Sequence, residues 1–144
     1  MRIRAFDESD TDAAIRLWED CGLTRPWNDP QRDIDRKLTT QPELFLVGEN
    51  DDAIVATAMI GFDGHRGWVY YLAVDREQRG RGYARSLMAE AERLLIQLGC
   101  PKIMLMVRAE NIAVIDLYEH LDYTLESTVL LGKRLIPDQP RPAH

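Results

Sequence analysis

The stretch Trp68–Leu98, WVYYLAVDREQRGRGYARSLMAEAERLLIQL, decides the fold of this chain. Trp68–Val74 is an apolar run typical of a strand. Tyr83–Leu98 carries apolar residues at spacings of three and four, which is typical of a helix with one buried face. The loop Asp75–Gly82 joins the strand to the helix. It therefore lies at the start of the helix, where backbone N–H groups lack intrahelical partners. We therefore expect an anion-binding site at this loop.

The loop is basic, although the chain of 144 residues is acidic. The formal net charge is −6, whereas residues 76–85, REQRGRGYAR, hold four arginines and one acid and are locally +3. Gly80 and Gly82 leave the backbone open to an anion. The side chains that can add positive charge and forked donors are Arg79, Arg81 and Arg85. This composition predicts a phosphate cradle, and the acidic remainder argues against a general nucleic-acid partner.

The elements around this stretch predict one domain with a mixed α/β (α+β) sheet. In chain order they are a strand at Arg2–Phe6, a helix after Asp7 or Ser9 that stops at Gly22, a helix from Asp29-Pro30 to near Thr40, strands Leu44–Glu49 and Ile54–Phe62, a hairpin turn at Asp63-Gly64, the opening strand and helix, a strand at Ile103–Val107, a helix from Ile112 to about Leu121, and two short strand pieces within Tyr123–Ile136. The order is β-α-α-β-β-β-α-β-α-β, an antiparallel meander followed by a crossover helix. We expect residues 1–136 to form the domain and the proline-rich residues 137–144 to be a disordered tail.

Several classes of site are disfavoured by missing patterns. Cys21 and Cys100 form no CxxC pair and lie near no histidine at zinc spacing, so we expect reduced thiols, no metal and a cytoplasmic location. No apolar run is long enough to cross a membrane, and the first residues lack the apolar segment of a signal peptide. A nucleotide-dependent enzyme is disfavoured because the Walker and Rossmann glycine patterns are absent.

Residues 74–88, VDREQRGRGYARSLM, resemble the coenzyme A pyrophosphate loop of the GNAT superfamily of N-acetyltransferases. The family signature is Q/R-x-x-G-x-G/A, and here Glu77 stands at the first position, before Gly80 and Gly82. The resemblance covers nearly the whole chain and is greatest to the small bacterial YpeA-like acetyltransferases, on segments RPWNDP, FDGHRG and LGKRLI. It implies the GNAT acyl-CoA N-acyltransferase fold, with acetyl-CoA as co-substrate. The residues that the resemblance assigns to acetyl-CoA are Leu72, Ala73, Val74, Arg79, Gly80, Arg81, Gly82, Tyr83, Ala84, Arg85 and Asn111.

Two further family features can be carried over by position. In the family a bulge splays the strand before the loop, and the backbone of that strand, here Leu72–Val74, pairs with the pantetheine arm and the acetyl carbonyl. The family motif N-x-x-A-x-x-x-Y-x-x-x-G-F resembles residues 111–123, in which Asn111 and Tyr118 match while Val114 and Asp122 depart. By resemblance, Tyr118 is the catalytic residue that protonates the leaving thiolate.

The general base and the acceptor are less defined. Several family members carry a glutamate four residues before the bulge, where this chain has Trp68. The remaining candidates are a water chain or one of Asp63, His65, Tyr70 and Tyr71. Alternation along a strand would let at most one of the two tyrosines face the site. Trp27 and Asn28 are expected to form a wall of the acceptor pocket. The acidic net charge weakly favours a cationic acceptor.

The resulting hypothesis is an acetyl-CoA-dependent N-acetyltransferase, an acyltransferase that acts by direct attack of a primary amine on the thioester. The acceptor is a small molecule or a protein, and neither nucleic acid nor a membrane is expected as a partner. Homodimers are common in the family. The alternative is a non-catalytic acyl-CoA-binding regulatory module, which the missing glutamate favours and Tyr118 disfavours.

Overall fold

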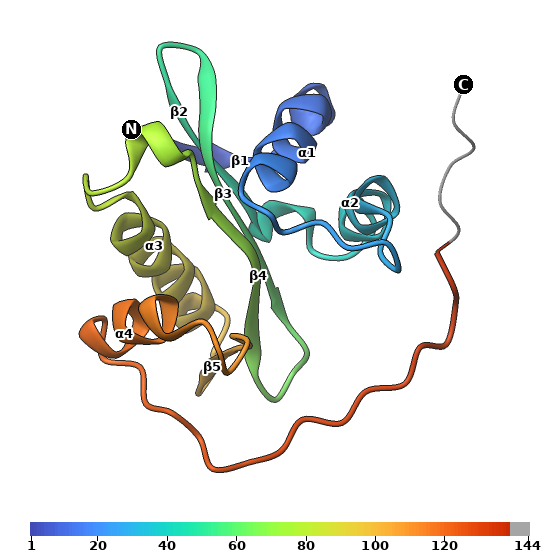
Figure 1. The fold of residues 1–144 in the computed structure, drawn as a ribbon, viewed down its shortest axis with the longest axis vertical. Coiled ribbons are helices and arrows are strands. Elements are labelled where there is room, and N and C mark those ends of the chain that lie inside the picture. Colours follow the sequence, from blue (N-terminus) through green and yellow to red (C-terminus); the bar gives the residue numbers. More distant parts are fainter. Residues whose placement is uncertain (139–144) are drawn as a thin grey trace.

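The computed structural model describes residues 1–138, which form a sheet with helices on both faces (Figure 1). The strands and α-helices, in chain order, are β1 (Arg2–Ala5), α1 (Thr11–Asp20), α2 (Pro30–Leu38), β2 (Phe45–Asn50), β3 (Ala53–Phe62), β4 (Gly67–Val74), α3 (Tyr83–Gln97), β5 (Ile103–Leu105) and α4 (Ile112–His120). The predicted strand, glycine-rich loop and long helix are therefore β4, its following loop and α3.

The sheet confirms the predicted meander and crossover. Its five strands lie in the order β1-β2-β3-β4-β5. Strands β1 to β4 pair antiparallel, and β5 pairs parallel with β4 after the crossover through α3. The observed architecture is thus the mixed α+β sheet that the sequence predicts.

Each face of the sheet has its own apolar core. Helix α3 packs on one face, where Leu87, Met88 and Leu95 are almost fully buried. Helices α1 and α2 cover the other face, where Trp18 and Ile34 are fully buried (Figure 1). The Asp29 carboxylate accepts a hydrogen bond from the Gln31 N–H at 2.9 Å, as expected for the cap of α2.

The strand β4 is irregular at its centre. Thr57 pairs with Ala73 and Met59 with Tyr70, so Ala58 alone opposes both Tyr71 and Leu72. Tyr71 takes up the extra residue with φ +50°, a left-handed conformation that is uncommon outside glycine. On its other side β4 pairs with β5 only up to Val69 and Leu105. The edge of β4 beyond Val69 is therefore open toward β5.

The strand pieces predicted within Tyr123–Ile136 are wrong, since the structure has no strand after α4 among its described residues. This segment runs extended along the outside of the molecule (Figure 1), and Leu125, Val129 and Leu131 are exposed on it. A strand requires a neighbouring backbone to pair with, and apolar composition alone does not provide one. The strand predicted at Ile103–Val107 also ends earlier, at Leu105.

The end of the described chain is fixed on α2. The Asp138 side chain is 1% exposed and forms ion pairs at 2.7 Å with Arg36 and with Arg134. It also accepts a hydrogen bond from the Asp29 N–H at 2.9 Å. Asp138 belongs to the segment predicted as a disordered tail, and residues 139–144 of that segment lie outside the described residues.

Candidate active site

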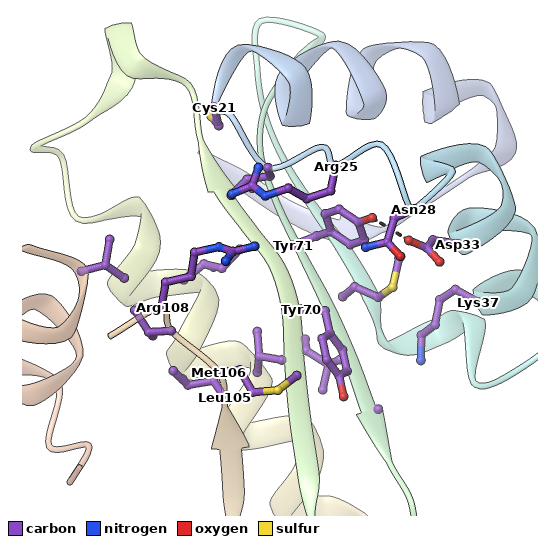
Figure 2. Close-up of a pocket in the computed structure, with 18 of the residues that line it drawn as sticks. Cys21, Arg25, Asn28, Asp33, Lys37, Tyr70, Tyr71, Leu105, Met106 and Arg108 are labelled. Carbon is purple, nitrogen blue, oxygen red and sulfur yellow. Dashed lines mark hydrogen bonds between the residues drawn. The ribbon is translucent and has the colours of Figure 1, made fainter. Parts of the chain in front are cut away.

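A pocket of about 900 Å³ lies where β4 separates from β5. One side of it is formed by α2 and the loop between α1 and α2, which contribute Arg25, Trp27, Asn28, Asp33, Arg36 and Lys37. The other side comes from β5, the segment after it and α4, which contribute Leu105, Met106, Val107, Arg108, Asn111, Val114 and Tyr118. Tyr70 and Tyr71 of β4 lie between the two sides (Figure 2), and Leu72 of the same strand also lines the pocket. The splayed strands thus open directly into the pocket.

The bulge in β4 is held by a buried network. The Thr57 hydroxyl, fully buried, accepts a hydrogen bond from Trp18 Nε1 at 2.9 Å and donates one to the Tyr71 carbonyl at 2.8 Å. The Tyr71 ring stacks on Trp18 with ring centroids 3.8 Å apart, and its hydroxyl donates to Asp33 Oδ2 at 2.6 Å (Figure 2). Burial, followed by the Asp33 carboxylate, raises the pKa of Tyr71. These contacts fix the backbone of β4 where it is open to the pocket.

Both Tyr70 and Tyr71 line the pocket, so the expectation that at most one of them could face the site is wrong. Strand alternation holds only while each residue of one strand opposes one residue of its neighbour. The extra residue at Tyr71 interrupts that register and turns consecutive side chains toward the same cavity.

Tyr118 reaches the pocket from α4 and is 8% exposed. Its ring makes an edge contact with Tyr123, with centroids 5.7 Å apart. Burial raises the pKa of Tyr118 to about 12, so its hydroxyl is protonated at neutral pH and able to donate a proton. Asn111, the N-cap of α4, also lines the pocket, and its side chain makes no capping hydrogen bond.

The glycine-rich loop lies beyond the pocket, at the end of β4. Gly80 and Gly82 adopt φ +81° and +77°, and a Cβ at either position would meet no heavy atom within 4 Å. Gly82 is the N-cap of α3 and offers no side-chain partner to the first N–H groups of the helix. The loop therefore presents open backbone donors and the positive end of a helix of 15 residues, which suit an anion.

Other predicted cofactor residues have different surroundings. Arg79 Nε donates to the Val74 carbonyl at 3.2 Å, and Arg81 donates to the Gln78 side chain at 3.0 Å. The Tyr83 hydroxyl accepts a hydrogen bond from the Asn50 amide at 2.8 Å. Ala73 is buried against α1, so only its backbone is available to a ligand. Leu72 lines the pocket, whereas Val74, Ala84 and Arg85 do not.

The predicted acceptor residues divide into two groups. Trp27, Asn28 and Tyr70 line the pocket, whereas Asp63 and His65 lie in the exposed β3–β4 hairpin and do not. The Asp63 carboxylate accepts hydrogen bonds from the Arg66 and His65 N–H groups at 2.7 and 2.8 Å, which lower its pKa. Asp63 thus stabilises the turn in which it lies.

Five charged residues of the pocket, Arg25, Asp33, Arg36, Lys37 and Arg108, were not predicted as site residues from the sequence. Asp33 and Lys37 are one helical turn apart on α2. The sequence of this helix is mostly polar and is typical of a helix exposed to solvent. Their spacing was visible, but only the packing of α2 against the sheet shows that they face a cavity. Arg25 and Arg108 lie in irregular segments without a periodic signal.

Among residues 1–138, no group of three or more His, Cys, Asp or Glu side chains is placed to hold a metal ion. In the same part of the chain, every helix is too short or too polar to span a bilayer.

Comparison with known proteins places this geometry in a family. The model of the Acetyltransferase (GNAT) family matches residues 4–123. An acetyltransferase of Yersinia enterocolitica is 56% identical over 139 residues, covering 96% of this chain and 99% of the relative.

Solved structures with the same fold include AAC(6')-Iy in complex with the bisubstrate analogue CoA-S-monomethyl-acetylneamine, with a TM-score of 0.77, 16% identity and coverage of 93% of this chain and 98% of that one. The NatC complex bound to Gag peptide and CoA matches with a TM-score of 0.70 and 25% identity, covering 83% of this chain and 82% of that one. The chain therefore belongs to the GNAT family of acetyltransferases.

Proposed function

We propose that this acetyltransferase transfers an acetyl group from acetyl-CoA to a primary amine by direct attack on the thioester. The observation that carries the proposal is the opening of β4 from β5 at the Tyr71 bulge, between the glycine-rich loop and Tyr118. An extended ligand can lie along this opening, with its anionic end at the glycine-rich loop and its reactive end near Tyr118. AAC(6')-Iy and the NatC complex, which share the fold, are described with CoA-type ligands.

The described residues fit acetyl-CoA. The pyrophosphate suits the loop at Gly80 and Gly82, where there is open space beside each glycine and no side chain caps the first N–H groups of α3. The pantetheine arm carries amides, which suit the unpaired edge of β4 beyond Val69, including Leu72, Ala73 and Val74. A backbone N–H on that edge can polarise the acetyl carbonyl. The thioester would then lie in the pocket that Tyr118 and Asn111 line.

The chemistry balances with the groups present. The amine nitrogen forms a bond to the acetyl carbon, the carbon–sulfur bond breaks, and the sulfur leaves with the bonding electrons. Tyr118, which is protonated at neutral pH, donates its proton to that sulfur. The new amide nitrogen gives up its extra proton, and the tyrosine regains one from it or from water. The products are an N-acetylated amine and free coenzyme A.

The described residues offer few groups that could accept the proton of the amine. Asp63 and His65 lie outside the pocket, and Trp68 cannot accept a proton. Burial raises the pKa of both Tyr70 and Tyr71 and keeps them neutral, and Tyr71 already donates to Asp33. We therefore propose that the amine binds in its neutral form and that water in the open pocket accepts the proton that its nitrogen loses after attack on the acetyl carbon.

The experiment that tests this function combines binding with turnover. Isothermal titration with acetyl-CoA is expected to show binding to one site per chain. Release of free thiol from acetyl-CoA is then measured over a panel of primary amines, with the acetylated amine identified by mass spectrometry. Binding without thiol release on any amine would favour the non-catalytic regulatory module, and no binding at all would exclude both functions.

A further inference from the structure

The pocket is strongly cationic, although the chain as a whole is acidic. Its lining contains the cations Arg25, Arg36, Lys37 and Arg108, and a single carboxylate, Asp33. That carboxylate already has partners, since it accepts from the Tyr71 hydroxyl at 2.6 Å and from Arg36 at 3.3 Å. Arg36 is further paired with Asp138 at 2.7 Å. The pocket therefore offers a cationic acceptor no free acid among the described residues.

The other three cations have no acidic partner within hydrogen-bond distance among residues 1–138. Arg25 donates only to the backbone carbonyls of Gly22 and Thr24, at 2.7 and 2.9 Å. Arg108 extends from the segment after β5 toward β4, opposite Arg25, while Lys37 points into the pocket from α2 (Figure 2). Like charges arranged around one cavity repel one another unless an anion enters it.

Lys37 is the most informative of these cations because it is 9% exposed. A Cβ at Gly61 would lie 3.7 Å from Lys37 Nζ, so the absence of a side chain at Gly61 leaves room beside the amine. Burial lowers the pKa of Lys37, and the charge of Glu43 opposes that shift without a hydrogen bond between the two side chains. Among the described residues the Lys37 ammonium donates no hydrogen bond, so it is free to bind an anionic ligand group that enters the pocket.

We propose that the acceptor is an amine that also carries an anionic group, a carboxylate or a phosphate, which binds Lys37 while the amine faces the bulge of β4 and Tyr118. This inference rests on the proposed acetyltransferase function. It reverses the lean toward a cationic acceptor that the net charge suggested, because the acids of this chain lie mostly outside the pocket. Arg25 from the α1–α2 loop and Arg108 from the segment after β5 would add to the attraction.

The phosphates of acetyl-CoA are a poor explanation for Lys37. The cradle for them lies at the start of α3, beyond the end of β4, whereas Lys37 lies on α2 (Figure 1). None of the residues from Arg79 to Arg85 lines the pocket with Lys37. A variant of Lys37 should therefore alter the KM for the acceptor and leave the KM for acetyl-CoA unchanged.

The test compares acceptors that differ only in charge. Wild-type protein is assayed for thiol release with ω-amino carboxylates from glycine to 6-aminohexanoate, with the matching amides, and with phosphoethanolamine. We expect kcat/KM to be at least about tenfold higher for the best acceptor with an anionic group than for its matching amide, the size of one charge-assisted hydrogen bond. The carboxylate and phosphate arms show which anion the site prefers.

The variant K37Q should remove that preference by raising the acceptor KM about tenfold or more. K37R, which keeps the charge, should retain most of it. The matched control is R32Q, which makes the same charge change on the exposed side of α2, outside the pocket. Thermal unfolding of each variant shows that differences in KM do not come from misfolding.

Two failures are distinguishable. If wild-type protein acetylates neutral or purely cationic amines as well as anionic ones, or K37Q behaves like R32Q, the anionic acceptor is excluded while the acetyltransferase function stands. If acetyl-CoA binds but no thiol is released from it with any of the amines, the proposed function itself is excluded.

Discussion

Tyr118 is the residue on which the proposed chemistry depends most. Tyr118 lines the pocket, and its ring packs in the core and against Tyr123. Tyr118→Phe keeps the ring and removes the proton, so we expect kcat to fall about tenfold or more, with little change in acetyl-CoA affinity. Steady-state thiol release and isothermal titration on the same preparation measure the two quantities. An unchanged kcat would remove Tyr118 from the mechanism.

At the residue scale, the sequence was informative where chemistry follows from residue type. Asn111 and Tyr118 could be carried over from a motif, and both line the pocket. Lys37 could not be identified, because a lysine on a polar helix is ordinarily solvated, and only tertiary packing buries it. His65 and Asp63 were plausible by type, yet the hairpin holds them away from the cavity.

At the scale of elements, the loop before α3 gives a prediction with an internal control. Gly82 at the start of α3 and Gly99 after its end both have φ near +78°, at +77° and +79°, in open space. Gly82→Ala and Gly99→Ala should each lower the free energy of unfolding by about 1–2 kcal/mol, since alanine is strained there. Only Gly82→Ala should also raise the KM for acetyl-CoA, by about fivefold, because the added Cβ crowds the cradle. Equal KM values in both variants would argue against a cradle at Gly82.

The bulge of β4 gives a second prediction at this scale. Thr57→Val keeps the shape of the side chain but leaves Trp18 Nε1 and the Tyr71 carbonyl without their hydrogen bonds. We expect the free energy of unfolding to fall by about 2–3 kcal/mol. We also expect kcat to fall, because the Tyr71 backbone loses its support, and Thr57→Ser should restore much of both. Urea unfolding measures the free energy, and steady-state thiol release measures kcat. A Thr57→Val variant with unchanged stability and kcat would show that this network does not support the site.

Elements were predictable where local pattern and tertiary structure agree. The apolar periodicity of α3 and the runs of β2 to β4 needed only their own residues to be recognised. The bulge in β4 was expected only by resemblance to the family, because strand alternation says nothing of the register with β3. The prediction of strands after Tyr123 is wrong because the segment has a strand-like composition but no paired neighbour in the described chain.

At the scale of the whole molecule, the segment after α4 returns to the acceptor side of the pocket. Its end is held by Asp138 on Arg36 and the Asp29 N–H, and Arg134 donates to Asn28 Oδ1 at 2.5 Å. Asn28 lines the pocket, so this attachment supports one of its walls. A distant part of the chain thus helps to shape the acceptor side.

This attachment should depend on pH. The Arg36 guanidinium and then the Asp29 N–H hold the pKa of Asp138 well below its usual range. The folded-state pKa is depressed, so the contribution is present above the ordinary carboxyl pKa of about 3.9 and is lost as pH falls below it. We expect Asp138→Asn to release the segment at neutral pH, seen as faster hydrogen exchange at the Asp29 amide, whose N–H donates to the Asp138 carboxylate. Wild-type protein should approach the variant only in acid, and equal exchange at neutral pH would contradict the anchoring role.

The central claim is that acetyl-CoA reacts in the opening between β4 and β5, and a crystal structure with bound acetyl-CoA tests it most directly. We predict the pyrophosphate on the backbone at Gly80 and Gly82, the pantetheine arm along Leu72–Val74, and the thioester sulfur within hydrogen-bond distance of the Tyr118 hydroxyl. A thioester placed outside the pocket, or a sulfur that Tyr118 cannot reach, would contradict the account.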